Sequence, residues 1–387
     1  MKQIWMVCLI IISLFCFPLS IAAEPSTDVT PSLLDHVSTE ELEESWQFIN
    51  EEYGEFMPSY NLGSFKEFVE NDGEVQSTDW FQGILKFLFQ ELMVNGKLLA
   101  SLLLLTLFST LLQSVQSSFE NTAVSKIAYL VVYLVLISLA LESFQQVIDY
   151  TLGSINRMSS FMIGLLPLLL GIMASFTHLM SISFFHPIIV ALVQSSGLLV
   201  KYILIPLFAS SALLLIMGSL NETYKVDQLA ELLRKTGLAV MGVFLTIFLG
   251  VISVQGTVTA VQDGVTMKTA RFVTGNFVPV VGRLFTDATD TILGASLVLK
   301  NTLGLAGVVI LLGIAIFPAI KVFAIAIIYK LAAALLQPLG DGPVIKAMDV
   351  VSRHIMYIFA ALLMVSMMFF LVIVIMVAAS NITMMVR

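Results

Sequence analysis

The most regular feature of the chain is a series of apolar runs of about 20 residues, the length that crosses a bilayer. Short polar segments separate the runs. We predict eight main spans: Leu98–Leu112, Ile127–Leu141, Phe161–Ser175, Pro187–Val200, Ile203–Leu220, Leu238–Val258, Leu303–Ala319 and Ile355–Ala379. Two regions can be divided differently, so the pattern predicts an all-α, polytopic membrane protein with seven to nine transmembrane helices.

One ambiguous region is Pro187–Leu220, which Lys201 and Pro206 interrupt. Two short helices or a hairpin fit this stretch better than one over-long helix, since proline breaks helices. The other is Leu303–Ala334, which contains Pro318, Lys321 and Lys330.

The first 22 residues resemble a secretory signal peptide. Lys2 is followed by an apolar core from Ile4 to Phe17 and by a cleavage site at Ala22, with Ala23 as the alternative. This layout is typical of exported proteins. The other interpretation is an uncleaved first membrane helix. The two cysteines, Cys8 and Cys16, both lie in this segment, so cleavage would leave a chain without thiols or disulfides.

A small amphipathic unit follows the signal. Ser38 and Glu41 have the spacing of a helix capping box. The next apolar residues recur on one helical face that ends before Gly54, and they are Leu42, Trp46, Ile49 and Tyr53. A second short helix is predicted over residues 64–73. The apolar face is either a docking surface for other extracytoplasmic proteins or the underside of a cap on the chain's own membrane domain.

Two further segments are amphipathic. Residues 80–96 begin with Trp80 and Phe81 and end at Gly96, as in helices that lie in the membrane interface. Between Gly250 and Gly307 the chain is too polar for a lipid-facing span and too apolar for an ordinary loop. The sequence therefore divides into a signal peptide (1–22), an acidic extracytoplasmic segment (23–79), an amphipathic interfacial helix (80–96), a first membrane helix group (97–260), a polar Gly-rich amphipathic or re-entrant region (261–300) and a C-terminal membrane helix group (301–387).

The polar region carries the charged residues that the pattern explains least. Arg283, Asp287 and Asp290 fall on one stripe of a helix, and Asn276 opens a predicted break before them. Charged groups within membranes usually face a bundle interior or a water path. The candidate conduit or subunit-contact residues are Arg283, Asp287, Asp290, Asn276, Lys268 and Arg271. The other interpretation is that these helices lie at the interface with the stripe in water.

Composition excludes most other classes of protein. The 387 residues are 58% hydrophobic and 12% charged, with a mean hydropathy of +0.96. Soluble domains are roughly half apolar and about a quarter charged. A soluble enzyme, a coiled coil, a disordered chain and a nucleic-acid-binding domain are therefore excluded as the main theme.

Charge is also divided unevenly. Residues 24–80 hold 15 acidic residues and one basic residue, whereas residues 81–387 hold 12 acidic and 17 basic residues. A segment poor in Lys and Arg is expected on the exported side of a membrane. With the first loop outside, alternation of the predicted spans puts Lys225, Arg234 and Lys235 inside.

The sequence shows no pattern of catalytic chemistry. The four histidines form no metal-binding motif, and neither a P-loop nor a nucleophile elbow is present. We expect no catalytic residues, no cofactor and no metal site, and any nucleotide-driven work requires a separate ATPase subunit. A weak similarity between the series starting at Ile205-Pro206 and at Phe317-Pro318 suggests an internal repeat of the kind found in transporters.

Several long strings resemble the stage III sporulation protein AE family of endospore-forming bacteria. They are Glu52-Tyr53-Gly54, the run from Trp80 to Phe89, Val94-Asn95-Gly96-Lys97-Leu98-Leu99, FLGVISVQGTVTAVQDGV (248–265), TGNFVPVVG (274–282) and Leu336-Gln337-Pro338-Leu339-Gly340-Asp341. The resemblance spans nearly the whole chain, including its last residues, NITMMVR.

This resemblance implies a role that the residues alone do not indicate. Family members are multi-pass proteins of the mother-cell membrane around the forespore, and they are needed for spore development after engulfment. The implied partners are the other membrane and extracytoplasmic proteins of the stage III sporulation A operon and, indirectly, stage II sporulation protein Q on the forespore side. Together they resemble a specialised secretion or feeding channel, with the acidic segment in the intermembrane space. The family has no established catalytic residues.

Three hypotheses follow. The chain is a non-enzymatic subunit of a channel or export apparatus, an autonomous secondary transporter, or a non-conducting scaffold. Solute uptake by the purified protein alone favours the transporter, and dependence on partner subunits favours the channel subunit.

Overall fold

A computed structural model of the chain describes residues 40–56, 77–118, 123–174, 179–219, 226–277, 281–339 and 342–385. Within these ranges the protein is helical and contains no strand. The elements are α3 (Glu40–Tyr53), η1 (Gly54–Phe56), α5 (Ser77–Val94), α6 (Gly96–Ser118), α7 (Ala123–Ala174), α8 (Leu179–Leu199), η2 (Val200–Leu204), α9 (Ile205–Gly218), α10 (Asp227–Phe277), α11 (Val281–Leu336), η3 (Gln337–Leu339) and α12 (Pro343–Met385).

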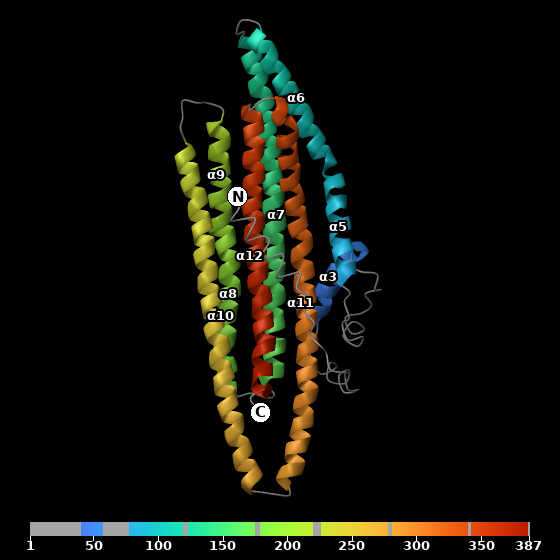
Figure 1. The fold of residues 1–387 in the computed structure, drawn as a ribbon, viewed down its shortest axis with the longest axis vertical. Helices are drawn as coiled ribbons and strands as arrows, with labels where there is room; N and C mark the ends of the chain where they lie inside the picture. Colours follow the sequence, from blue (N-terminus) through green and yellow to red (C-terminus); the bar gives the residue numbers. More distant parts are fainter. Residues whose placement is uncertain are drawn as a thin grey trace.

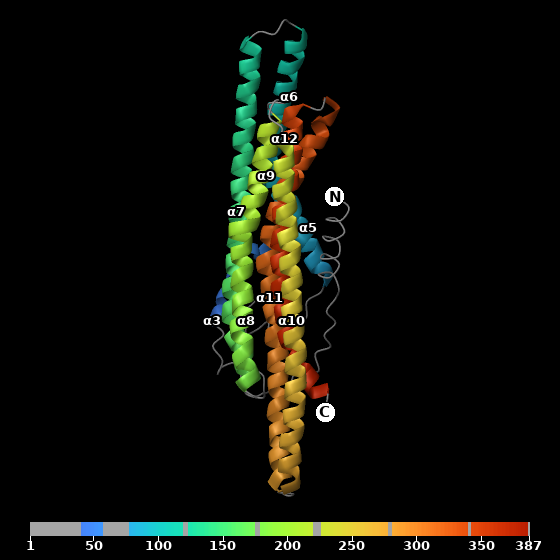
Figure 2. The same ribbon diagram turned by 90° about the vertical axis from the view of Figure 1, so that its left-hand side faces the viewer.

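The long helices run side by side along the long axis of the molecule (Figures 1 and 2). Helices α11 and α12 form the centre, because 67% of the most apolar window of each is buried, against 17% for α10. Helix α7 packs on both central helices, while α8, α9 and α10 cover the opposite side of α12. The all-α architecture of a polytopic membrane protein is thus confirmed.

Five described helices are long and apolar enough to cross a membrane, or six if the bent pair α5–α6 counts as one span. This is fewer than the seven to nine helices predicted. Predicted spans Ile127–Leu141 and Phe161–Ser175 merge into α7, a helix of 52 residues. The polar middle of α7 stays helical because Ser143 and Ser154 form hydrogen bonds to α11, with the Ser154 hydroxyl donating to the carbonyl of Ile314 at 3.0 Å.

The division of Pro187–Leu220 into two short helices or a hairpin is wrong. The chain keeps its direction through α8, η2 and α9, and residues Pro187–Gly218 form one continuous apolar stretch (Figure 1). The reason lies at η2, a single turn of π-helix from Val200 to Leu204. Pro206 lacks an N–H and crowds the preceding turn, and a π-turn absorbs that defect without ending the helix.

The predicted boundaries near the N-terminal side are confirmed where the structure describes them. Helix α3 ends at Tyr53, before Gly54, and α5 ends at Val94, before Asn95 and Gly96. The Asn95 side-chain amide donates to the carbonyl of Glu91 at 2.9 Å, and α5 and α6 meet at a bend of 44°. The signal peptide with Ala22 and Ala23, and the predicted helix over residues 64–73, lie outside the described residues.

The polar region around residues 261–300 forms the end of a helical hairpin. Helix α10 ends at Phe277 and α11 begins at Val281, next to the predicted break at Asn276. The two helices extend past the end of α12 and meet at one extremity of the molecule (Figures 1 and 2). We call residues 263–277 and 281–300 the hairpin tip.

Candidate functional site

The six predicted conduit or contact residues all lie in the hairpin tip. Lys268, Arg271 and Asn276 belong to the last three turns of α10, and Arg283, Asp287 and Asp290 to the first three turns of α11. Their side chains lie outside the described part of the structure, so the backbone alone places them. Residues separated in the sequence by the turn are thus brought to one end of the molecule.

The hairpin places residues of opposite charge at equal heights. Lys268 precedes the last residue of α10 by nine positions, and Asp290 follows the first residue of α11 by nine. Arg271 and Asp287 lie six positions from the same two ends. Since both helices rise by about 1.5 Å per residue, each pair shares a level. The tip therefore alternates cationic and anionic positions across two antiparallel helices.

A second group of charges surrounds the bundle at mid-height. Lys321 on α11 has its Nζ 5.5 Å from the ring centre of Tyr150 on α7. Arg234 on α10 donates to the Tyr357 hydroxyl of α12 at 3.2 Å. Lys201 lies in η2, one turn beyond Gly197, whose backbone is close to Ile155 of α7. We call Asp149, Lys201, Arg234 and Lys321 the charged belt, because these contacts bring all four to about one level.

The N-terminal helix α3 sits against this belt on α7 and α11. Tyr53 stacks on Phe317, with ring centres 4.2 Å apart and planes at 9°. Phe87 of α5 meets both rings edge to face, at 5.8 Å from Tyr53 and 5.1 Å from Phe317. Phe56 of η1 adds a further edge contact to Phe87 at 4.9 Å. An aromatic cluster thus fixes the end of α3 at the junction of α5 and α11.

Two cations of the membrane bundle are covered by α3. The Lys321 ammonium lies 3.7 Å from a Glu52 carboxylate oxygen and 5.5 Å from the ring centre of Tyr53. The Arg157 guanidinium lies over the Phe48 ring at 3.8 Å. Burial raises the pKa of the Tyr53 hydroxyl, and the neighbouring Glu52 carboxylate acts in the same direction. The ring is therefore neutral at physiological pH and presents its face to Lys321.

The four predicted docking residues form the buried side of α3. Leu42, Trp46, Ile49 and Tyr53 are each at most 5% exposed and belong to the main hydrophobic core. This placement corresponds to the second interpretation of that face, a cap on the chain's own membrane domain. Docking of another protein through these side chains would require α3 to leave the bundle.

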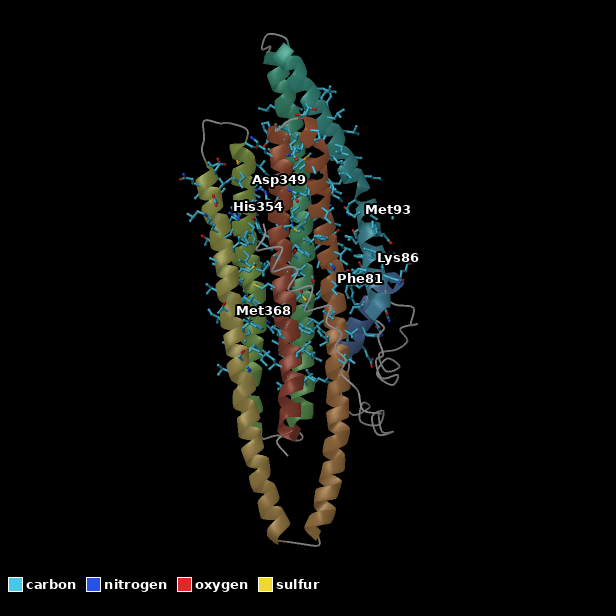
Figure 3. All side chains as sticks on the ribbon, viewed as in Figure 1. Phe81, Lys86, Met93, Asp349, His354 and Met368 are labelled. Atoms are coloured by element: carbon cyan, nitrogen blue, oxygen red, sulfur yellow. The ribbon has the colours of Figure 1, made fainter. Side chains whose placement is uncertain are left out.

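A buried polar network on the other side of α12 joins three helices (Figure 3). His354 is 2% exposed, and its Nδ1 donates to the carbonyl of Val350 at 2.8 Å. Its Nε2 lies 3.0 Å from the hydroxyl oxygen of Ser211 on α9, which itself lies 2.7 Å from the carbonyl of Ala230 on α10. The sequence gave no signal of this cluster, because Ser211 and His354 are 143 positions apart.

Chemically, the described sites provide charge, hydrogen bonds and apolar surface. Within the ranges that the structure describes, no three His, Cys, Asp or Glu residues are grouped to hold a metal ion. At the upper end of α12, Asp349 pairs with Lys330 and with Arg353, both of which are about half exposed (Figure 3). Such groups suit contacts between helices or between proteins.

Comparison with known proteins gives the family. The sequence profile of stage III sporulation protein AE matches residues 60–380, most of the chain. The chain belongs to the stage III sporulation protein AE family. A relative from Bacillus subtilis (strain 168), named stage III sporulation protein AE, is 50% identical over 365 residues, which cover 94% of this chain and 92% of the relative. No solved structure matches the chain.

Membership of the stage III sporulation protein AE family links the helical bundle to sporulation and to the stage III A group of sporulation proteins. The family is named for a developmental stage, not for a catalysed reaction. The residue strings that carried the resemblance lie on different elements. The Trp80–Phe89 run is on α5, and the 248–265 string and most of the 274–282 string are on the hairpin of α10 and α11.

Proposed function

We propose that the chain is an integral membrane subunit of a mother cell-to-forespore channel or specialised secretion complex, needed for spore development after engulfment. Its family and its bundle of long apolar helices support this proposal. In this proposal the protein resides in the mother-cell membrane around the forespore. Its acidic N-terminal segment faces the intermembrane space, and the chain performs no catalysis of its own.

The packing of α12 carries the choice of a subunit over an autonomous transporter. This helix lies between α7, α9, α10 and α11, and its side chains fill the centre of the described bundle. Leu362, Val365, Met368, Val372 and Ile373 are each 0% exposed. A bundle packed to this degree leaves no continuous space along its own axis. Any conduit therefore forms between this chain and other subunits, which include those of the stage III sporulation A operon.

The test combines a cellular and a reconstituted measurement. In sporulating cells that lack the native copy, a tagged version is expected to restore spore formation and to co-purify with other proteins of the operon. The purified chain alone in liposomes is expected to conduct no ions and to take up no solutes. Solute uptake by the isolated chain would favour a transporter instead, and restored sporulation without any operon partner would contradict the proposal.

A further inference from the structure

The apolar helices are longer than a bilayer is thick. The five candidate spans contain 41, 32, 28, 34 and 35 residues. At about 1.5 Å per residue they extend roughly 42–62 Å, whereas the hydrocarbon core is about 30 Å thick. Lipid therefore covers only part of each helix, and hydropathy does not identify which part. The position of charges along the aligned helices does.

Contacts between helices give their relative heights. Met158 of α7 meets Ser366 of α12, with sulfur and oxygen 3.6 Å apart. One turn above Met158, Ser154 donates to the carbonyl of Ile314 on α11. Arg234 of α10 meets Tyr357 of α12, nine positions above Ser366. Helix α8 lies beside α7, where Gly197 is close to Ile155. The heights of all five helices can therefore be compared residue by residue.

One height interval is free of charge on all five helices. Directly below Arg157 and the charged belt, no Asp, Glu, Lys or Arg occurs in residues 158–174, 179–199, 236–262, 301–320 and 366–385. We call these ranges the uncharged band. On α12 the band contains 20 residues, which corresponds to about 30 Å. Its outer surface on α10 is apolar, since Val243 and Ile247 are 59% and 56% exposed.

Charges return on both sides of the band. Above it, η2 and the helices that form the band carry Lys126, Glu142, Asp149, Arg157, Lys201, Asp227, Glu231, Arg234, Lys235, Lys321, Lys330, Lys346, Asp349 and Arg353. Below it, the hairpin tip carries Asp263, Lys268, Arg271, Arg283, Asp287, Asp290 and Lys300. A charge at the bilayer centre costs about 2.5–3.5 kcal/mol even on insertion scales. A bilayer shifted upward by half its thickness would enclose several such groups.

We propose that the bilayer surrounds the uncharged band, so that α7, α8, α10, α11 and α12 each cross it once. The charged belt, with α3 at the rim of the band, then lies on one membrane surface, and the hairpin tip lies beyond the opposite surface. The proposal rests on the integral membrane location in the proposed function. With the acidic segment exported, the tip and the end of α12 are cytoplasmic.

Two consequences differ from the sequence-based expectations. Arg234 and Lys235 lie on the exported side, opposite to the side that alternation of the predicted spans indicates. Arg283, Asp287 and Asp290 lie in water at the tip instead of lining a path at membrane depth. The exposed apolar side chains of α6 and of the start of α7, such as Leu104 and Leu134, lie above the band, so the bilayer does not cover them in this position.

The depth of the bilayer is testable with single nitroxide labels in a Cys8→Ala, Cys16→Ala background. The full chain is labelled at Ile247→Cys in the band, at Leu134→Cys above it or at Thr289→Cys in the tip, and reconstituted in phosphatidylglycerol–phosphatidylethanolamine vesicles. The label at residue 247 is expected to be accessible to oxygen and shielded from an aqueous nickel chelate. The label at residue 289 is expected to show the reverse. A lipid signature at residue 134 together with an aqueous signature at residue 247 would overturn the placement.

Sidedness is tested in intact protoplasts with a membrane-impermeant maleimide. Gln337→Cys, in the exposed turn between α11 and α12, is expected to react from outside, and Thr289→Cys only after permeabilisation. Equal reactivity of both positions from outside would contradict the five-span topology. Release of the protein from membranes by alkaline carbonate would instead reject the proposed integral membrane function, so the two failures are distinguishable. Only variants that support sporulation are compared.

Discussion

At the scale of single residues, Lys321 is held by partners from two other elements. Glu52 supplies a carboxylate, and Tyr53 and Tyr150 supply ring faces. The Lys321 side chain is 19% exposed and that of Glu52 is 51% exposed, so the ion pair is partly screened by solvent. Such a pair with its cation–π contacts stabilises by about 1–2 kcal/mol in total.

We therefore expect Lys321→Glu to lower the thermal stability of the purified protein and to expose α3 to protease, because two carboxylates then face each other. The measurement is the unfolding midpoint in detergent together with limited proteolysis. The charge-swapped double variant, Glu52→Lys with Lys321→Glu, is expected to recover part of the loss. A double variant no better than the single one would show that the ion pair does not hold α3.

Gly83 marks the closest approach of η1 to α5. A Cβ added there would overlap the carbonyl oxygen of Phe56, which is backbone and cannot rotate away. We expect Gly83→Ala to cost about 1–3 kcal/mol, the usual range for overpacking, and to loosen the aromatic cluster. Gly153→Ala is the matched control, because nothing lies within 4 Å of its added Cβ. Equal unfolding midpoints for the two variants would contradict this packing.

Ser211 connects α9 to both α10 and α12 in the buried network around His354. Replacing it with alanine leaves His354 Nε2 without its hydroxyl partner, and a buried unsatisfied group costs about 1–3 kcal/mol. We expect Ser211→Ala to lower the unfolding midpoint. Ser138→Ala, which removes an exposed hydroxyl bonded only within α7, is expected to be neutral. A neutral Ser211→Ala would mean that the network adds no stability.

At the scale of elements, α3 is held by a single apolar face. Ile49 is 2% exposed, whereas the nearby Gln47 is on the exposed side. Ile49→Asp buries an unpaired carboxylate and removes apolar contacts, a loss of about 3–5 kcal/mol that exceeds what so short a helix gains by seating. We expect this variant to release α3 while the bundle stays folded.

The readout is protease cleavage within residues 40–56, followed by mass spectrometry, with Gln47→Asp as the control for added negative charge. Cleavage of both variants at the same rate would show that α3 is not seated in the wild type. If Ile49→Asp also abolishes binding of operon partners without changing the bundle, the seated position of α3 is part of the docking surface.

Local signals in the sequence predicted the elements well where chemistry acts over a few residues. The stop at Gly54, the break at Gly96 and the turn after Asn276 follow from glycine, proline and helical periodicity. Span count failed where the decision depends on distant contacts. The middle of α7 remains helical because its serines bond to α11, and Pro206 is absorbed by a π-turn, neither of which a window of sequence reveals.

The candidate sites divide in the same way. The residues of the hairpin tip were visible as charges out of place in an apolar chain. The seating of α3 on Lys321 and Arg157 was not, since it joins residues more than 100 positions apart. The apolar face of α3 was recognised, and the sequence left open what covers it. The structure answers that question with the chain's own α7 and α11.

At the scale of the whole molecule, a solid bundle carries a charged hairpin that extends beyond it (Figure 1). The interior is packed around α12, so function requires surfaces that meet other subunits. The hairpin tip is the part of the described protein that projects farthest from the bundle at that end, and it pairs basic positions on α10 with acidic positions on α11. Changes there act on contacts and leave the core untouched.

We therefore expect the triple variant Arg283→Ala, Asp287→Ala and Asp290→Ala to keep the unfolding midpoint and cellular level of the wild type but to reduce spore formation sharply. Heat-resistant colony counts and a late forespore reporter measure the loss, and immunoblotting measures the level. Exchanging the charges of Arg271 and Asp287, which share a level on the two helices, is expected to be tolerated better than either single reversal. Normal sporulation of the triple variant would assign these residues to neither conduit nor contact, and the chain would then act as a scaffold.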